Sequence, residues 1–142
     1  MPFKMIVVAA AEDLKKAYAI RTEVFVLEQK VPLELEMDAD DQRAIHVLGS
    51  IDHEAVACGR IVMDRDHTHI GRVAVKKEHR GKGLGKQLME YLIQVCKDKG
   101  ARDIILHSQV QAIPFYASLG FQAYGDIFLD AGIEHRAMKM EL

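Results

Sequence analysis

A basic, glycine-rich junction constrains the fold of this chain more than any other feature. The segment His79–Leu88 reads HRGKGLGKQL, with three glycines at alternate positions among basic side chains. A β-prone run, Ile70–Val75, precedes the junction, and a helical pattern over about Gly83–Lys99 follows it. The junction therefore predicts a strand, a turn and a helix in direct succession, which is an α/β arrangement.

The remaining elements extend this arrangement along the whole chain. β-prone runs predict six further strands, at Phe3–Val8, Ala44–Ile51, Ala55–Asp64, Asp103–His107, Phe121–Tyr124 and Glu134–Met140. Helical periodicity predicts helices over Ala11–Glu28 and Ala112–Leu119, and Lys30–Gln42 reads as a loop or a short irregular helix. The order of elements indicates a single domain, residues 1–142, built as a mixed sheet with helices on both faces.

Composition and charge narrow the class of protein. With 142 residues and 49% hydrophobic residues, the chain can bury one core, and its formal charge of −2 argues against a protein that mainly wraps nucleic acid. We see neither a membrane-spanning run nor a signal peptide, so no membrane partner is expected. Cys58 and Cys96 have no CxxC spacing and predict reduced, buried thiols in a cytoplasmic protein.

The junction is suited to hold a phosphate or a pyrophosphate. A helix N-terminus presents unpaired N–H groups and a partial positive charge, and glycines let a ligand approach the backbone. Arg80, Lys82 and Lys86 would add charge, although a surface turn with solvated lysines is the alternative. A Walker A loop is excluded because Gln87 follows Lys86, and a Rossmann fingerprint is excluded because its third glycine is replaced by Lys86.

Two motifs resemble those of the GCN5-related N-acetyltransferases, the GNAT superfamily. Arg80-x-x-Gly83-x-Gly85 after a strand is similar to the family's acyl-CoA loop, and Pro114–Phe121, PFYASLGF, resembles its FYxxLGF segment. Arg21–Gln29 and Phe128–His135 resemble a small bacterial subgroup with likeness to hexosamine-phosphate acetyltransferases. The resemblance implies an α/β (α+β) fold whose mostly antiparallel sheet of six to seven strands is splayed in the middle.

The resemblance implies acetyl-CoA as the cosubstrate. Backbone groups of Val73 and Val75 would pair with the pantetheine arm as if it were an added strand, and amides of residues 80–86 would hold the pyrophosphate. The implied cofactor-binding residues are Val73, Ala74, Val75, Arg80, Gly81, Lys82, Gly83, Leu84, Gly85, Lys86, Gln109 and Phe115. Gln109 has the alternative of capping the next helix.

The implied chemistry needs an acid and a base. Tyr116 matches the family tyrosine that often protonates the departing thiolate, with packing on the sheet as its alternative. The attacking amine must be neutral, which costs about 4–5 kcal/mol at pH 7 for a lysine-like group. His107 is a candidate base or orienting residue, and a strand-end histidine bonded to backbone is its alternative. The backbone N–H of Val75 or a neighbour is the family's usual oxyanion donor.

The acceptor is a small-molecule amine of open identity. Gly71 and Arg72 stand where hexosamine enzymes carry acidic residues, so Arg72 either binds an anionic group of the substrate or pairs with a carboxylate. Glu28, Glu36 and His46 are candidate acceptor contacts, against solvated surface as the alternative. The acidic segment around Glu36 favours a cationic acceptor, whereas Arg72 favours an anionic or sugar-phosphate one.

Two further expectations complete the hypothesis. We expect no metal site, because His67-x-His69 has no matching carboxylate cluster and Asp38–Asp41 lacks the glycine and glutamate of an EF-hand loop. The alternative function is a catalytically weak acyl-CoA-sensing module that acts through a partner, motivated by the absence of an obvious base. The resemblance also admits a homodimer, for which no residue supplies evidence.

Overall fold

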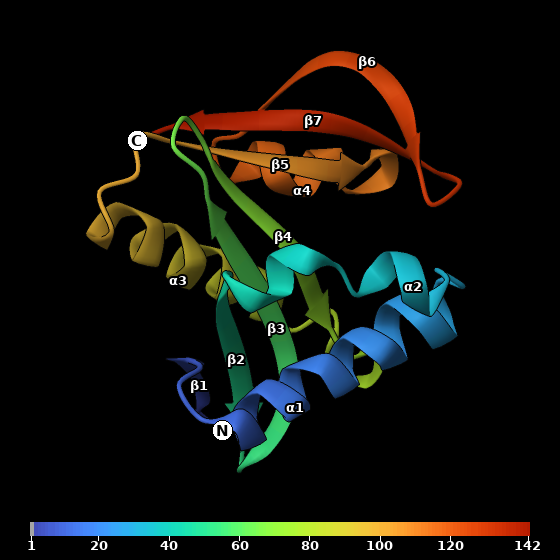
Figure 1. Ribbon diagram of the computed structural model, residues 1–142, viewed down its shortest axis with the longest axis vertical. Helices are drawn as coiled ribbons and strands as arrows, with labels where there is room; N and C mark the ends of the chain where they lie inside the picture. The colour runs from blue at the N-terminus through green and yellow to red at the C-terminus, as the bar shows by residue number, and fades with distance from the viewer. Residues whose placement is uncertain (1) are drawn as a thin grey trace.

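The central element of the computed structural model, which describes residues 2–142, is a seven-stranded open sheet (Figure 1). Its strand order is β1-β2-β3-β4-β5-β7-β6, and every neighbouring pair is antiparallel except β4 and β5. The strands are β1 (Phe3–Val7), β2 (Ile45–Ile51), β3 (Glu54–Met63), β4 (Thr68–Val75), β5 (Asp103–Gln109), β6 (Gln122–Asp130) and β7 (Ile133–Glu141). The expected mixed, mostly antiparallel sheet is confirmed.

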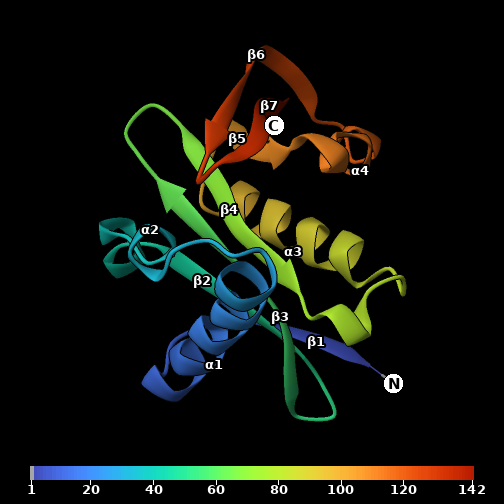
Figure 2. The same ribbon diagram turned by 90° about the vertical axis from the view of Figure 1, so that its right-hand side faces the viewer.

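Helices cover both faces of this sheet. They are α1 (Ala11–Arg21), the π-helix η1 (Thr22–Glu28), α2 (Leu33–Glu36), α3 (Leu84–Asp98) and α4 (Ile113–Ser118), with short 3-10 turns at η2 (Ala39–Gln42), η3 (Lys77–His79) and η4 (Val110–Ala112). α1 lies on one face of β2–β4 and α3 on the other (Figure 2). Alternate residues of β2 serve the two faces, since Val47 belongs to the α3 cluster and Leu48 to the α1 cluster.

The sheet is splayed between β4 and β5. These parallel strands pair only at His69 and Ile105, and beyond that point β4 runs away from β5 (Figure 1). β4 also carries a bulge, because Cys58 and Arg60 of β3 face Ala74 and Gly71, which leaves one extra residue in β4. Arg72, inside the bulge, has a φ of 52°, which a non-glycine residue rarely adopts. The bulge and the splay together leave one edge of β4 without a strand partner.

Two sequence predictions of element boundaries were wrong. The expected helix Ala11–Glu28 is an α-helix only to Arg21, after which the backbone widens into the π-helix η1, where β-branched and aromatic residues are frequent. The strand expected at Phe121–Tyr124 runs as β6 to Asp130. A register irregularity between Tyr124 and Phe128 breaks the alternation of polar and apolar residues there and hides the second half of the strand.

Other features of the described residues agree with the sequence. Helix α3 buries Leu84, Leu88, Met89, Leu92 and Cys96 along one face, as its periodicity predicts. Both cysteines are buried free thiols, and burial raises the pKa of each to about 12. None of the helices within residues 2–142 is long and apolar enough to cross a membrane.

Candidate functional site

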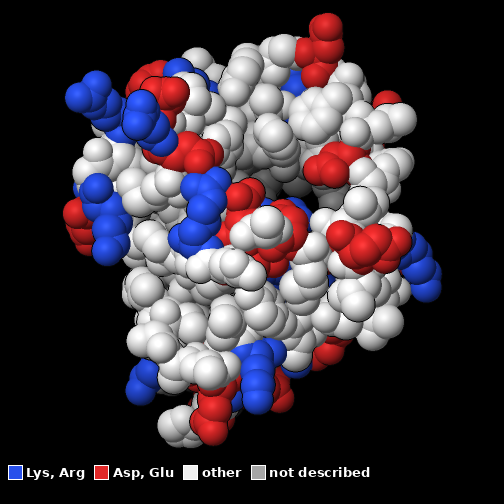
Figure 3. Space-filling view, viewed as in Figure 1, with Lys and Arg blue, Asp and Glu red and all other residues white. Residues whose placement is uncertain are grey.

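A cleft of about 510 Å³ opens where β4 leaves β5. Figure 3 shows the hollow on this face of the molecule, with acidic side chains gathered around it. The lining comes from η1, α2, β3, β4, β5, α4 and the turn between β6 and β7. Six residues singled out from the sequence line the cleft: Glu36, Arg72, Val73, His107, Gln109 and Tyr116. The splay therefore brings together residues from distant parts of the chain.

Tyr116 lies on α4 with its ring packed edge-on against Phe115 and Phe121, at centroid distances of 5.0 and 6.1 Å. Burial raises the pKa of Tyr116 to about 12, so its hydroxyl is protonated at neutral pH and can donate a hydrogen bond. Phe115 does not face the cleft. It faces the start of α3, where a Cβ on Gly85 would lie 3.5 Å from its Cζ atom.

His107 projects from β5 with its ring edge-on to Phe128, 5.0 Å away between centroids. Burial lowers the pKa of His107 below its ordinary value, and His69 and His135 act in the same direction, against the opposing effect of Asp130. Within residues 2–142, the His107 ring forms no hydrogen bond, which disfavours the interpretation of a histidine bonded to backbone. A neutral imidazole that lines the cleft is able to accept a proton.

The glycine-rich loop follows β4 and leads into α3. Gly81 and Gly83 have φ angles of 77° and 78°, and no side chain caps the helix. The N–H groups of the first turn of α3 therefore point outward without an intrahelical acceptor. Lys82 and Lys86 are exposed beside them. The local geometry matches the anion-binding turn predicted from the sequence, although the loop does not line the cleft.

Arg80 and Glu28 form an ion pair outside the cleft. The guanidinium of Arg80 donates to both oxygens of Glu28, at 2.6 and 2.9 Å, and to the carbonyl oxygen of Val75, at 2.8 Å. The end of η1 is thereby tied to the end of β4. Ala74 and Leu84 have buried side chains, in the clusters under α1 and α3 respectively, so only their backbone groups are available to a ligand.

An arginine network lies behind one wall of the cleft, and its members are Arg21, Arg60, Arg72, Glu36, Asp38 and Asp41. Arg21 contacts Glu36 at 3.0 Å and Asp41 at 2.6 Å, and both carboxylates are buried. Arg72 contacts Glu36 at 2.9 Å and Asp38 at 3.2 Å. Burial would raise the pKa of Asp41, but Arg21 and Arg60 outweigh that effect and lower it to about 2.

This network corrects two interpretations made from the sequence. Glu36 is only 2% exposed and bound by two arginines, so it is neither solvated surface nor a free contact for an acceptor. His46 is also buried, and its Nε2 lies 2.9 Å from the carbonyl oxygen of Asp41. Of the two alternatives for Arg72, pairing with a carboxylate is the one that the structure shows.

The cleft also contains Gln29, His69 and Asp130, to which the sequence analysis assigned no catalytic or binding role. Gln29 of the segment after η1 accepts a hydrogen bond from Gln109, at 2.8 Å, and Gln109 in turn accepts one from Gln111, at 2.6 Å. His69 and Asp130 also line the cleft, from β4 and the end of β6. These residues are far apart in sequence and follow no common spacing, so no local signal could have grouped them.

A mostly antiparallel sheet split between two strands, with a glycine-rich helix start beyond one of them and a protonated tyrosine in the gap, defines an acetyltransferase-type fold. The family model for the acetyltransferase (GNAT) domain matches residues 9–142. The chain therefore belongs to the GNAT family of acetyltransferases, and the expected enzyme class, N-acetyltransferase, is confirmed.

Individual relatives agree with this assignment. The chain is 38% identical over 136 residues to the protein named uncharacterized N-acetyltransferase YjcF of Bacillus subtilis, which covers 95% of this chain and 97% of that protein. The crystal structure of Escherichia coli ElaA superposes with a TM-score of 0.87 at 29% identity, over 99% of both chains. A GNAT family acetyltransferase from Elizabethkingia anophelis, solved with acetyl-CoA bound, shares the fold, with a TM-score of 0.77 at 20% identity over 99% and 98% of the chains.

Among residues 2–142, no group of three or more histidine, cysteine, aspartate or glutamate side chains is arranged to hold a metal ion.

Proposed function

We propose that the chain transfers an acetyl group from acetyl-CoA to the amine of a small molecule, by direct attack of the amine on the thioester. The observation that carries this proposal is the divergence of β4 from β5 beyond the His69–Ile105 pair. Tyr116, His107 and Val73 all line the gap that results. Family membership supports the reaction type, and the gap supports where it takes place.

The backbone near the gap is suited to hold the cosubstrate. The edge of β4 at Val73 and Val75 has no strand partner on the β5 side, so its N–H and C=O groups can pair with an extended chain such as pantetheine. The N–H groups of residues 81–86 would bind the pyrophosphate, assisted by Lys82 and Lys86. Arg80 acts differently from the expectation, because its guanidinium is engaged by Glu28 and Val75 and holds the loop in place.

Two side chains of the cleft supply the proton transfers. His107, kept neutral by its surroundings, accepts the proton that the amine loses as it attacks the thioester carbon. The C–S bond then breaks, and Tyr116 donates its hydroxyl hydrogen toward the departing thiolate. Full transfer from a group of pKa about 12 to a thiol of pKa about 8.5 is uphill by roughly 5 kcal/mol, so Tyr116 acts first as a hydrogen-bond donor.

A titration calorimetry experiment with acetyl-CoA, with ATP and NAD as controls, tests the cosubstrate. We expect binding of acetyl-CoA alone, and folded protein that binds none of the three would overturn the proposal. Release of free thiol in the presence of an amine panel tests the transfer. Binding without thiol release would favour the alternative, a catalytically weak acyl-CoA-sensing module that acts through a partner.

A further inference from the structure

The arginines that line the cleft are already occupied by the protein itself. Arg60 donates to Asp38 at 2.7 and 2.9 Å and to Asp41 at 2.8 Å. Arg72 is held by Glu36, both by its carboxylate and by its carbonyl oxygen. Arg60 uses Nη1 and Nη2, and Arg72 uses Nε and Nη2, to bind carboxylate and carbonyl oxygens of the protein. Most guanidinium donors of the cleft are therefore already engaged, which disfavours an anionic acceptor.

The carboxylates of the cleft are less completely paired with cations than its arginines are paired with carboxylates. Asp40 and Asp64 share the single cation of Arg43, at 2.9 and 2.8 Å. Asp130 forms no ion pair with any residue in the described range 2–142. In all, four carboxylates and two guanidinium groups line the cleft, which gives the lining a charge of −2 with its histidines neutral. The excess favours a positively charged ligand.

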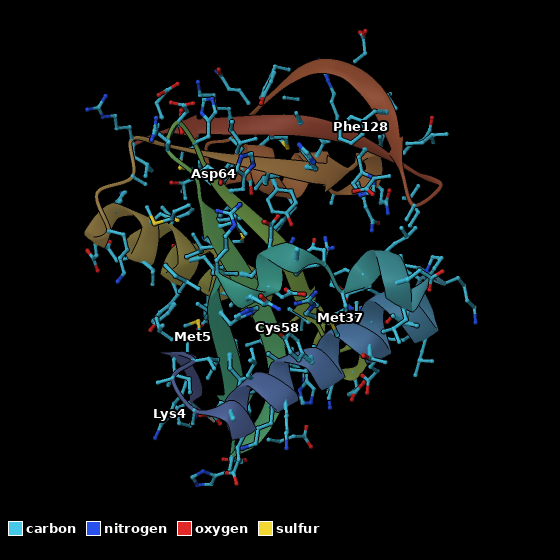
Figure 4. All side chains as sticks on the ribbon, viewed as in Figure 1. Lys4, Met5, Met37, Cys58, Asp64 and Phe128 are labelled. Carbon is cyan, nitrogen blue, oxygen red and sulfur yellow. The ribbon has the colours of Figure 1, made fainter. Side chains whose placement is uncertain are left out.

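One of these carboxylates, Asp64, lies away from the glycine-rich loop. Asp64 follows β3 and precedes β4, whereas the loop follows the end of β4, so the two stand at opposite ends of that strand. Figure 4 shows Asp64 and Phe128 above the segment that carries Met37, with Asp64 toward the left and Phe128 toward the right. A ligand that contacts Asp64 can therefore occupy the cleft together with a cosubstrate at the loop.

Between the carboxylates, the wall of the cleft is apolar. Phe25, Val31 and Leu35 contribute one side, and Ile133, the first residue of β7, contributes the other. Leu35 is 55% exposed, so it offers an aliphatic surface at the mouth and is not part of the core. An alkyl chain can contact this surface while a charged group at its end reaches a carboxylate.

We propose that the acceptor is an alkyl amine that carries a second positive charge, such as a linear diamine or a lysine-like side chain, and that Asp130 binds that second charge. This inference rests on the proposed acetyl transfer and names its substrate class. Asp130 is the specificity-determining carboxylate because, among the described carboxylates of the cleft, it alone forms no ion pair. Asp40 and Asp64 contribute more weakly, because the single positive charge of Arg43 neutralises only half of their combined negative charge.

Three acceptors with the same reactive amine and the same five-carbon chain test the proposal: diaminopentane, pentylamine and aminopentanoate. Their far ends are positive, neutral and negative. We expect kcat/KM to fall in that order, with about a twofold to fivefold advantage of diaminopentane over pentylamine, the size of one exposed ion pair. Asp130→Asn should abolish that advantage, so that diaminopentane and pentylamine react with equal kcat/KM. Arg43→Gln should enlarge it, because Asp40 and Asp64 lose their cation.

Calorimetry with acetyl-CoA on each variant separates a failure of the inference about the acceptor from a failure of the proposed acetyl transfer. Unchanged affinity is expected, since neither Asp130 nor Arg43 belongs to the glycine-rich loop, and within residues 2–142 neither forms an ion pair with a residue of it. If acetyl-CoA binds but the three amines react equally, or aminopentanoate is preferred, or Asp130→Asn lowers all three alike, the inference about the acceptor is overturned and acetyl transfer stands. If acetyl-CoA does not bind to the folded wild-type protein, both proposals are overturned.

Discussion

The cleft has two walls, and they use charged residues in opposite ways. Behind the first wall, the arginine network matches three guanidinium groups with three carboxylates. On the second wall, formed by β5 and the β6–β7 turn, burial lowers the pKa of His107, and Asp130 has no ion pair with a described residue. At this cleft, the presence or absence of an ion-pair partner therefore says more about the function of a charged side chain than its place in the lining does.

The first wall depends on the arginine network for its structure. Helix α2 has four residues, and an isolated helix of that length does not form in water. The arginines fix the segment 33–42 through its side chains and its backbone, because Arg21 and Arg72 both donate to the carbonyl oxygen of Glu36. The buried charges thus position one wall, and the other wall is left to act on a substrate.

Removal of Arg21, which lies behind the first wall, should change the stability of the protein more than any other substitution considered. Arg21→Met leaves Arg60 and Arg72 to face three carboxylates, so we expect the free energy of unfolding to fall by about 3 kcal/mol, the lower end for a broken buried pair. Urea denaturation measures the change. The matched control is Arg43→Gln, because Arg43 also holds two carboxylates but is 49% exposed, so its loss should lower the free energy of unfolding much less. Equal losses of unfolding free energy in the two variants would contradict the expected difference between a buried and an exposed arginine.

Loss of the Tyr116 hydroxyl should affect rate and leave stability nearly unchanged. We expect Tyr116→Phe to lower kcat about 10²-fold, the lower end for general acid catalysis, with little change in affinity for acetyl-CoA. Steady-state kinetics and calorimetry measure the two quantities. Tyr124→Phe, at an exposed tyrosine of β6, is the matched control and should leave kcat as it is. A wild-type kcat in Tyr116→Phe would remove the acid role.

The residues that sequence analysis placed well have requirements that are local. Gly81 and Gly83 adopt positive φ angles in a turn between a strand and a helix, and the sequence states both the turn and the glycines. Tyr116 was found because its neighbours form a motif. In each case the physical constraint is satisfied within a few residues, so a short segment contains the whole signal.

The residues that it misplaced depend on partners far along the chain. Glu36 was a candidate acceptor contact, with solvated surface as the alternative, because an acidic residue in an acidic segment is normally exposed. Its burial requires Arg21, fifteen residues earlier, and Arg72, thirty-six residues later, and neither pairing has a sequence pattern. The sequence analysis assigned no binding role to Asp130, because the absence of an ion-pair partner can be recognised only when the surrounding residues are known.

A methyl group at Gly83 should have a moderate effect on binding. Gly83 has a φ of 78°, and an added Cβ would meet no atom within 4 Å, so the protein itself offers strain but no clash. We expect Gly83→Ala to lose about 1 kcal/mol of stability and about tenfold in affinity for acetyl-CoA, because the methyl would stand where the pyrophosphate approaches. Denaturation and calorimetry measure the two losses.

The control for Gly83 lies at the other end of the same helix. Gly100 has a φ of 83° and equally open surroundings, so Gly100→Ala should show the loss of stability without the loss of affinity. If both variants bind acetyl-CoA as the wild type does, the pyrophosphate is not held at the start of α3.

The smallest expected effect is in the pH dependence of the second wall. His107 must be unprotonated to accept a proton, so kcat/KM should fall as the pH drops through the pKa of His107. Burial, His69 and His135 lower that pKa and Asp130 opposes them, so the acid limb should lie below the ordinary value of 6.5. Asp130→Asn should move the limb slightly further down, because the one group that stabilises the imidazolium is lost. A limb above 6.5 that does not respond to Asp130→Asn, measured with the neutral-tailed pentylamine, would assign the base to a group other than His107.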